Sequence, residues 1–259
     1  MSNYYFLASL LSELTIGSPS ELSFHEFDKL LDSNLTPSDR EQVRAIRRLY
    51  DIDNVRAMWN EEPHSQYGNY GLNDLDEALL TQSGLPGYVY EFLDRYDEKA
   101  ERMRHYPGLL GAYFSEEISR SSGFLKEYLT FEREWRLVAA AYRAKVMGRN
   151  VGSELQHEDP NEDLVAQILA QKDSPSFEAP TRFEPLVSLL ESKLDRPMEV
   201  HQAICEYRFS YLRGLVQDDF FSINKVLSYL VRLILVEEWL ELDKRKGLEI
   251  METIVKEAS

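Results

Sequence analysis

Histidines and carboxylates are the first side chains in this sequence that could do chemistry. Glu154-Leu155-Gln156-His157 has the Glu-x-x-His spacing of ferritin-like di-iron sites, which need two such motifs and two further glutamates on the helices of one bundle. This motif lies in a predicted connector, so we interpret it as a chance match. The other histidines form no His-x-x-x-His pair that would place two imidazoles on one helix face: they are His25, His64, His105 and His201. The sequence therefore predicts no metal site.

Motifs for nucleophilic chemistry and phosphate binding are missing as well. No Gly-x-Ser-x-Gly occurs, and Cys205 stands in an apolar helical pattern that is typical of a small core residue. The loop Gly68-Asn69-Tyr70-Gly71 is followed by no Lys-Ser/Thr and preceded by no predicted strand, so we interpret it as a turn. We expect no catalytic residue and no cofactor. An all-helical metalloenzyme, in which distant histidines and glutamates converge, is the alternative from another class.

Three charged runs are interpreted as solvated surface. His157-Glu158-Asp159-Pro160 places acidic side chains before a proline, which is ordinary loop chemistry. Glu132-Arg133-Glu134 and Glu237-Glu238 stand on predicted helices, where we expect them to face water. Such an acidic surface can steer a basic protein partner.

The elements that carry these residues are predicted to be helices throughout. Apolar residues recur at spacings of three and four, whereas the alternation of a half-buried strand is hard to find. Ser23 with Glu26 forms a predicted capping box, and Thr36 before Pro37 forms a predicted helix start. We expect helices over residues 4–14, from 23, over 37–62, 72–82, 88–104, 124–147, 162–171, 183–193, 198–216 and 222–254, with a shorter piece after Gly108. A polar connector over 151–161 completes the expected organisation, with either two lobes, residues 1–120 and 121–259, or one continuous domain.

Composition narrows the function classes. The 259 residues hold 29 Lys and Arg against 45 Asp and Glu, a net charge of −16, which repels nucleic acid. A single cysteine excludes an internal disulfide and is typical of a reducing compartment. The first residues lack a basic leader region, and no stretch reaches the roughly 18 apolar residues of a membrane span. We expect a cytoplasmic protein with no nucleic-acid partner and no direct membrane insertion.

Three segments in order resemble the C subunit of archaeal and bacterial A/V-type ATPases, the counterpart of the eukaryotic d subunit. Residues 49–59 contain Asp51-x-x-Asn54-x-Arg56, which resembles the Asp-x-x-Asn-x-Arg helix of that family. Residues 131–148 are similar to a second copy, with Trp135 where asparagine would stand. Residues 226–237 are similar to the closing helix of the family. From Tyr4 to Lys256 the chain also resembles an uncharacterised bacterial family, a domain of unknown function found beside A/V-type ATPase genes.

The resemblance implies both a shape and a role. The C subunit is a funnel of helices without catalytic residues that seats the central shaft on the membrane rotor ring. It implies an all-α fold, an elongated bundle of long antiparallel helices, with central-stalk and rotor-ring subunits as partners and a location peripheral to the membrane through them. The alternative is a helical adaptor or regulator that binds other proteins and has no ATPase involvement.

The candidate site residues come from these segments and are assigned structural roles first and partner contacts second. They are Asp53, Asn54, Arg56, Trp59, Trp135, Arg136, Tyr229, Arg232 and Glu237. We expect Asp53 and Asn54 to bond backbone groups at a helix junction, and Arg56 to pair with a nearby carboxylate. Trp59 and Trp135 have apolar neighbours three or four residues away, which predicts buried positions for both.

Overall fold

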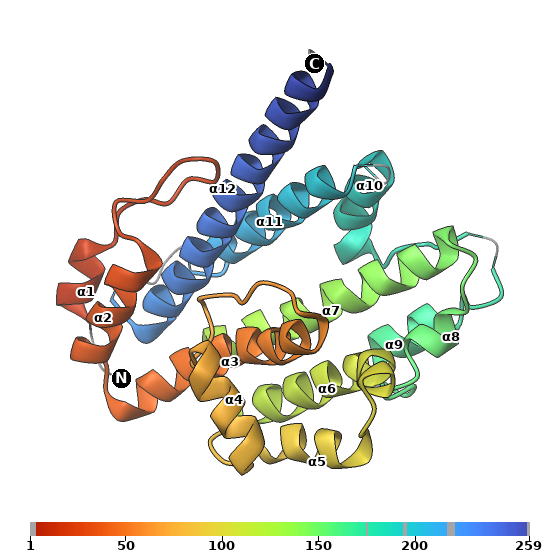
Figure 1. Ribbon diagram of the computed structural model, residues 1–259, viewed down its shortest axis with the longest axis horizontal. Helices are drawn as coiled ribbons and strands as arrows, with labels where there is room; N and C mark the ends of the chain where they lie inside the picture. Colours follow the sequence, from red (N-terminus) through yellow and green to blue (C-terminus); the bar gives the residue numbers. More distant parts are fainter. Residues whose placement is uncertain (1–3, 175, 194–195, 217–220, 258–259) are drawn as a thin grey trace. The chain divides into compact units, whose positions relative to one another are not determined.

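The computed structural model describes residues 4–174, 176–193, 196–216 and 221–257, with side chains up to residue 245. The described residues fold into twelve α-helices and a short 3-10 helix, and they include no strand (Figure 1). The predicted all-helical class is therefore confirmed. None of the described helices is both long enough and apolar enough to cross a membrane.

The chain divides into two compact units, of which the first is discontinuous. It combines residues 1–39 with residues 179–259, and the second unit is residues 40–178. This division differs from the expected lobes 1–120 and 121–259. The reason is that the helices on either side of residue 120 pack against each other and so belong to one unit.

The first unit is built around its last helix. Its elements are α1 (Tyr5–Leu10), α2 (Phe24–Asn34), η1 (Thr181–Phe183), α10 (Glu184–Lys193), α11 (Pro197–Gly214) and α12 (Ile223–Glu257). Helix α12 runs back along α11, and α1 and α2 pack against it as well (Figure 1). Every residue from Val226 to Val236 is buried, so this stretch of α12 is enclosed on all sides, as a central core helix must be.

The second unit is a set of packed helices around α6 and α7. Its elements are α3 (Pro37–Asn60, from Arg40 onward), α4 (Leu72–Thr81), α5 (Gly87–Arg95), α6 (Lys99–Arg120), α7 (Gly123–Val146), α8 (Val151–Glu154) and α9 (Asp163–Leu169). Helix α7 packs against α6, α8 and α9, and α5 packs against α6. The largest fully buried side chains here include Tyr113, Phe114, Tyr128 and Phe131.

Local sequence signals set several helix ends. The predicted capping box is present, since Ser23 N donates to Glu26 Oε2 at 2.9 Å and Glu26 N donates to Ser23 Oγ at 3.3 Å. Thr36 Oγ1 accepts a bond from Asp39 N at 3.3 Å at the start of α3, as predicted. Gly148 follows α7 with φ +64°, the left-handed conformation that ends helices and favours glycine.

Several predicted boundaries are wrong. The first expected helix, over residues 4–14, ends at Leu10, and the expected connector over 151–161 begins with helix α8. The expected helix 88–104 is interrupted at Tyr96, where α5 has ended and α6 has not begun. Helix α6 then continues through Pro107, where a break was expected. Pro107 is exposed, and a proline costs a helix interior about 3 kcal/mol; packing of α6 against α5 and α7 outweighs that cost. Helix α12 likewise continues through Gly247.

Both tryptophans at candidate positions are half-buried, so the prediction of buried positions is wrong for each. The Trp135 indole N–H donates to Glu132 Oε2 at 3.1 Å, and the guanidinium of Arg136 lies 4.5 Å from the ring centroid. Trp59 lies in the last turn of α3, stacked on Phe92 at 6.1 Å. The two rings are therefore in contact with aromatic or charged side chains while part of each remains exposed.

Replacing either tryptophan by alanine should therefore have a moderate effect. We expect Trp59→Ala and Trp135→Ala each to lower the free energy of unfolding by about 1–3 kcal/mol, because only part of the apolar ring area leaves the core. Urea denaturation at pH 7 measures this change in the free energy of unfolding. A loss above about 4 kcal/mol at either position would indicate a fully buried ring.

Candidate functional site

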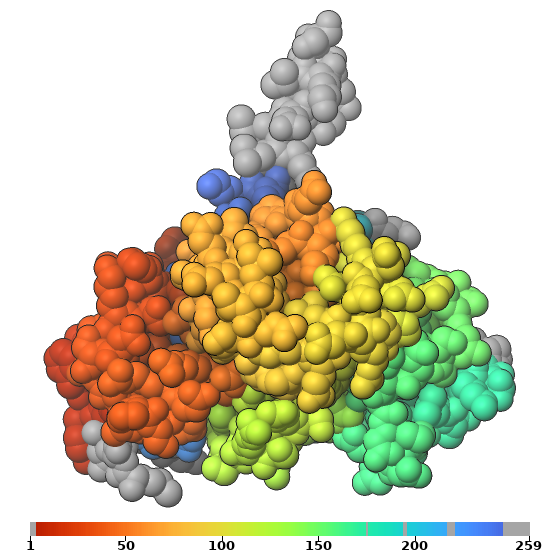
Figure 2. Space-filling model, turned by 60° about the horizontal axis from the view of Figure 1, so that its bottom comes forward, coloured from red at the N-terminus to blue at the C-terminus, as the bar shows by residue number. Residues whose placement is uncertain are grey.

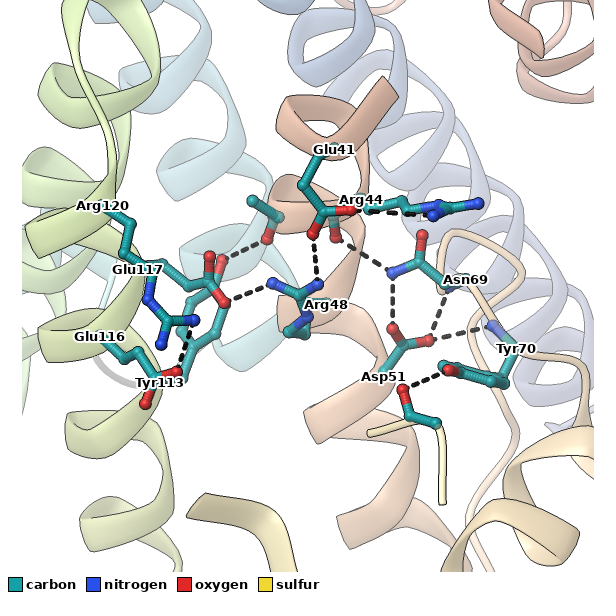
Figure 3. Close-up of polar contacts among 12 residues, drawn as sticks. Glu41, Arg44, Arg48, Asp51, Asn69, Tyr70, Tyr113, Glu116, Glu117 and Arg120 are labelled. Carbon is teal, nitrogen blue, oxygen red and sulfur yellow. Dashed lines mark hydrogen bonds and ion pairs between the residues drawn. The ribbon is translucent and has the colours of Figure 1, made fainter. Parts of the chain in front are cut away.

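Asp51 is a fully buried acid at the centre of a polar network on α3 (Figure 3). Its carboxylate accepts bonds from Asn69 N at 2.6 Å, Asn69 Nδ2 at 2.7 Å and Tyr70 N at 3.2 Å. Burial raises the pKa of the Asp51 carboxyl, although these donors oppose the shift. Two backbone N–H groups of the loop Gly68–Gly71, those of Asn69 and Tyr70, are thus bound to the protein's own carboxylate. The loop is a turn, as predicted.

Three side chains from one face of α3 hold the connection that follows this helix. Asn54 bonds Ser65 in both directions, with Ser65 N to Oδ1 at 2.7 Å and Nδ2 to Ser65 O at 2.9 Å. Arg47 donates to the carbonyls of Tyr67 and Gly68. Arg47, Asp51 and Asn54 stand at i, i+4 and i+7, so they share one helix face. A side chain at position 68 would bring a Cβ within 2.6 Å of Asp51 Oδ1, so only glycine fits there.

A second group of contacts, centred on Arg48, joins α3 to α6. Arg48 donates to Glu117 and, at 2.9 Å, to Glu41. The Arg48 and Glu117 side chains are 17% and 7% exposed. Burial alone would lower the pKa of Arg48, but the Glu117 and Glu41 carboxylates raise it above its usual value. Tyr113 adds a bond from its hydroxyl to the carbonyl of Ala45 at 2.9 Å.

Asp53 and Arg56 lie on a neighbouring face of α3 and meet Tyr106 of α6. The Tyr106 hydroxyl donates to Asp53 Oδ1 at 2.5 Å, so Asp53 bonds a side chain and not the expected backbone group. Arg56 lies 3.4 Å from Glu62 Oε2 and 5.6 Å from the centroid of the Tyr106 ring. Burial is the main cause that raises the pKa of the Tyr106 hydroxyl, and the nearby Asp53 carboxylate raises it further. Further along α3, the guanidinium of Arg102 lies 5.8 Å from the Trp59 ring.

The second segment places an equivalent acid inside α7. Glu132 is 0% exposed and accepts bonds from Trp135 Nε1 and from Arg136. Arg133 donates to both oxygens of Glu162, at 2.5 and 2.6 Å, and also to Glu158. The interpretation as solvated surface is thus wrong for Glu132, Arg133 and Glu158, whereas Asp159 and Pro160 are exposed as expected. Glu132 and Arg133 are enclosed because helix neighbours and the connector after α8 supply their partners.

The third segment lies in the first unit, on α12. Tyr229 is 1% exposed and meets Phe27 edge-on at 4.9 Å. Arg232 is 7% exposed, with its guanidinium 5.6 Å from the Phe209 ring, and burial lowers its pKa. Glu237 accepts a bond from Phe24 N at 2.7 Å, which caps the start of α2. Glu237 is therefore half-buried and bonded, not the solvated residue that was expected.

A pocket in the second unit contains a histidine pair that was not expected from the sequence. The pocket has a volume of about 360 Å³ and lies between α5, α6 and the connector after α8. His105 Nδ1 and His157 Nε2, both in its lining, are 3.3 Å apart. Burial is the main cause that lowers the pKa of His157, and the neighbouring His105 lowers it further. The sequence contains one indirect sign of this contact: Gly108 and Gly111 stand three residues apart in a helix. Small residues at this spacing indicate that another segment approaches the helix closely.

The two Glu-x-x-His motifs of the chain do not converge. Besides Glu154–His157, Glu61-Glu62-Pro63-His64 has the same spacing in the loop after α3, and it was overlooked in the sequence. Within the part of the chain that the structure describes, no group of three or more histidines, cysteines, aspartates and glutamates is arranged to hold a metal ion. Cys205 is buried in α11.

Comparison with known proteins places relatives along the whole chain. The family model described as a protein of unknown function, DUF2764, matches residues 1–258. An uncharacterized protein of Chlamydia muridarum is 28% identical over 262 residues, which cover 99% of this chain and 98% of the relative. An uncharacterized protein of Chlamydia trachomatis is 29% identical over 257 residues, covering 96% of each. No solved structure matches the chain.

Proposed function

The chain belongs to the DUF2764 family, and we propose that it is a non-catalytic component of a prokaryotic A/V-type ATPase that resembles the C subunit. In this role it joins or assembles the central stalk on the membrane rotor ring. It works in the cytoplasm, peripheral to the membrane through the other subunits. The resemblance implies an elongated bundle of antiparallel helices for this role, and the all-helical fold is compatible with it.

The observation that carries the proposal is a buried acidic side chain at the same position of two motif copies. Asp51 opens the motif in α3 and Glu132 opens it in α7, and both are 0% exposed. Acidic side chains are almost never fully buried unless they are paired, so two at the same motif position are unexpected by chance. In each copy the acid is bonded by donors of its own helix or of the loop that follows. This repetition supports the interpretation that residues 49–59 and 131–148 are copies of one unit of the C-subunit type.

The contacts are also suited to a part that transmits force. Buried ion pairs and bonds tie α3 to α6, and α7 to the connector after α8, in addition to apolar packing. Close-packed interiors of this kind have low compressibility and transmit strain. The candidate residues of the three segments are engaged in such internal contacts.

A helical adaptor that is unrelated to the ATPase is the second candidate, and one observation favours it. Leu80 is 78% exposed and Met147 is 64% exposed, and side chains of this kind can serve a protein partner. Helix α4, which carries Leu80, lies with α5 at the surface, in the yellow-orange region at the front of Figure 2. A coupling protein needs such contacts too, so only a functional test separates the two candidates.

The test compares ATP hydrolysis and ion pumping in membrane vesicles from a deletion strain. We expect hydrolysis to persist without the protein, because the nucleotide sites would lie on other subunits, and we expect the number of ions moved per ATP to fall. Adding the purified protein back should restore the ratio, whereas an unrelated helical protein of similar charge should not. Pumping at the normal ratio without the protein would leave the adaptor as the leading candidate.

A further inference from the structure

The histidine pair of the second unit is held in a defined geometry by three different segments. His105 comes from α6 and stacks on Tyr96 with ring centroids 4.4 Å apart and planes 11° apart. His157 comes from the connector after α8, and its ring meets that of His105 nearly at a right angle, 81°. Its neighbour Glu158 is held by Arg133 of α7. Each ring is thus held in place by residues other than its histidine partner.

A close approach of backbone to ring fixes His157 further. A Cβ at position 108 would lie 3.1 Å from His157 Nδ1, and one at position 111 would lie 3.2 Å from Glu158 Oε1. The two glycines of α6 therefore leave the space in which the connector residues lie. His157 Nδ1 lies next to Gly108, and Nε2 is directed at His105, three residues earlier on the same helix.

The separation of the two nitrogens suits a shared cation. In a tetrahedral zinc site with Zn–N bonds of about 2.0–2.1 Å, two nitrogen ligands are about 3.3–3.4 Å apart. His105 Nδ1 and His157 Nε2 are 3.3 Å apart and share one ring proton in a hydrogen bond, so a cation would take the place of this proton. Imidazole nitrogens are the commonest protein ligands of zinc and suit cobalt and nickel, whereas Mg²⁺ and Ca²⁺ prefer oxygen.

Space for the remaining ligands is present beside the pair. Both rings line the pocket of about 360 Å³, which is open to solvent on one side and has Glu91 and Ser115 in its lining. No third histidine, cysteine, aspartate or glutamate of the described residues completes a metal-binding group. Water or a small anion in the pocket must supply the other coordination positions, so the affinity should be well below that of a structural four-ligand site.

We propose that His105 and His157 form a two-imidazole binding site for a divalent transition-metal ion of the zinc class, open to the pocket. The site shares the Arg133–Glu158 contact with the second motif segment, but its test does not depend on the proposed ATPase role.

The test uses the full-length, tag-free protein with Zn²⁺ and Co²⁺ as probes, in millimolar Mg²⁺ to occupy carboxylates on the acidic surface. Side-chain ¹⁵N NMR of the wild-type protein should show that two of its five histidines respond to Zn²⁺. Co²⁺ should give the intense visible absorption of a tetrahedral site. His105→Gln and His157→Gln should each weaken binding by more than about tenfold, since even outer-shell changes cost about 10- to 100-fold.

His25→Gln is the matched control, because His25 is exposed on α2 of the other unit and should leave binding unchanged. Thermal unfolding without metal shows whether each variant is folded, and the wild-type NMR result does not depend on any variant. No histidine response at 100-fold excess of Zn²⁺ would overturn the proposal. A response to Zn²⁺ from all five histidines would also overturn the proposal. So would Zn²⁺ binding that is unchanged in both pocket variants, and either result would assign the metal to the acidic surface.

Discussion

Replacing Arg48 by methionine should lower the free energy of unfolding by about 3–5 kcal/mol, because the change leaves the Glu117 carboxylate buried without its cation. The Glu117 side chain is 7% exposed, so water cannot take the place of the guanidinium without opening the contact between α3 and α6. Burial raises the pKa of Glu117 and Arg48 opposes that shift, so the variant's carboxyl should take up a proton more readily. Urea denaturation at pH 7 measures the loss.

The double variant Arg48→Met with Glu117→Leu separates the cost of an unpaired charge from the value of the pair. We expect it to recover most of the stability, because an apolar pair of similar volume often replaces a buried ion pair without loss. Arg120→Met is the matched control: Arg120 pairs with Glu116 on the same helix, but its side chain is 69% exposed, so its loss should stay below about 0.5 kcal/mol. A double variant no more stable than Arg48→Met alone would show that the polar pair itself is required.

Signals between near neighbours in the sequence predicted the helix starts well. The capping box at Ser23 and the start at Thr36-Pro37 depend on residues at most three positions apart, and both are present. The continuation of α6 through Pro107 could not be predicted in the same way. It depends on packing against α5 and α7, whose contribution exceeds the local cost of a proline.

The polar contacts of the candidate site were even harder to predict from the sequence than the helix boundaries. Glu132 was expected to face water because it stands in a charged run, but partners on its own helix turn and the surrounding core enclose it. His105 and His157 are 52 positions apart, and Arg48 and Glu117 are 69 apart. Pairings of this range follow from the tertiary arrangement. A single sequence contains only indirect signs of them, such as the spaced glycines of α6.

The second large effect is expected at Asp51. Asp51→Ala should lower the free energy of unfolding by about 2–4 kcal/mol, because it removes the acceptor of three N–H groups from Asn69 and Tyr70. Each buried donor left without an acceptor costs about 1–3 kcal/mol, and part of that cost is relieved if the loop opens to water. We therefore expect the loop over residues 61–71 to become sensitive to proteases. Asp76→Ala, at an exposed position on α4, should change stability by less than about 0.5 kcal/mol.

Asp51→Asn tests the charge separately from the hydrogen bonds, through the dependence on pH. Because burial raises the pKa of Asp51 in the folded state above its unfolded value of about 3.9, the folded protein binds this proton more tightly than the unfolded chain does. The wild-type protein should gain stability from Asp51 as the pH falls through the folded-state pKa, and asparagine has no such gain. Denaturation at a series of pH values from 7 down toward the unfolded-state pKa of about 3.9 should therefore show the advantage of wild type over Asp51→Asn growing toward acid. An advantage that shrinks toward acid would mean that the N–H donors outweigh burial and that Asp51 acts as a stabilised anion that fastens the loop to α3.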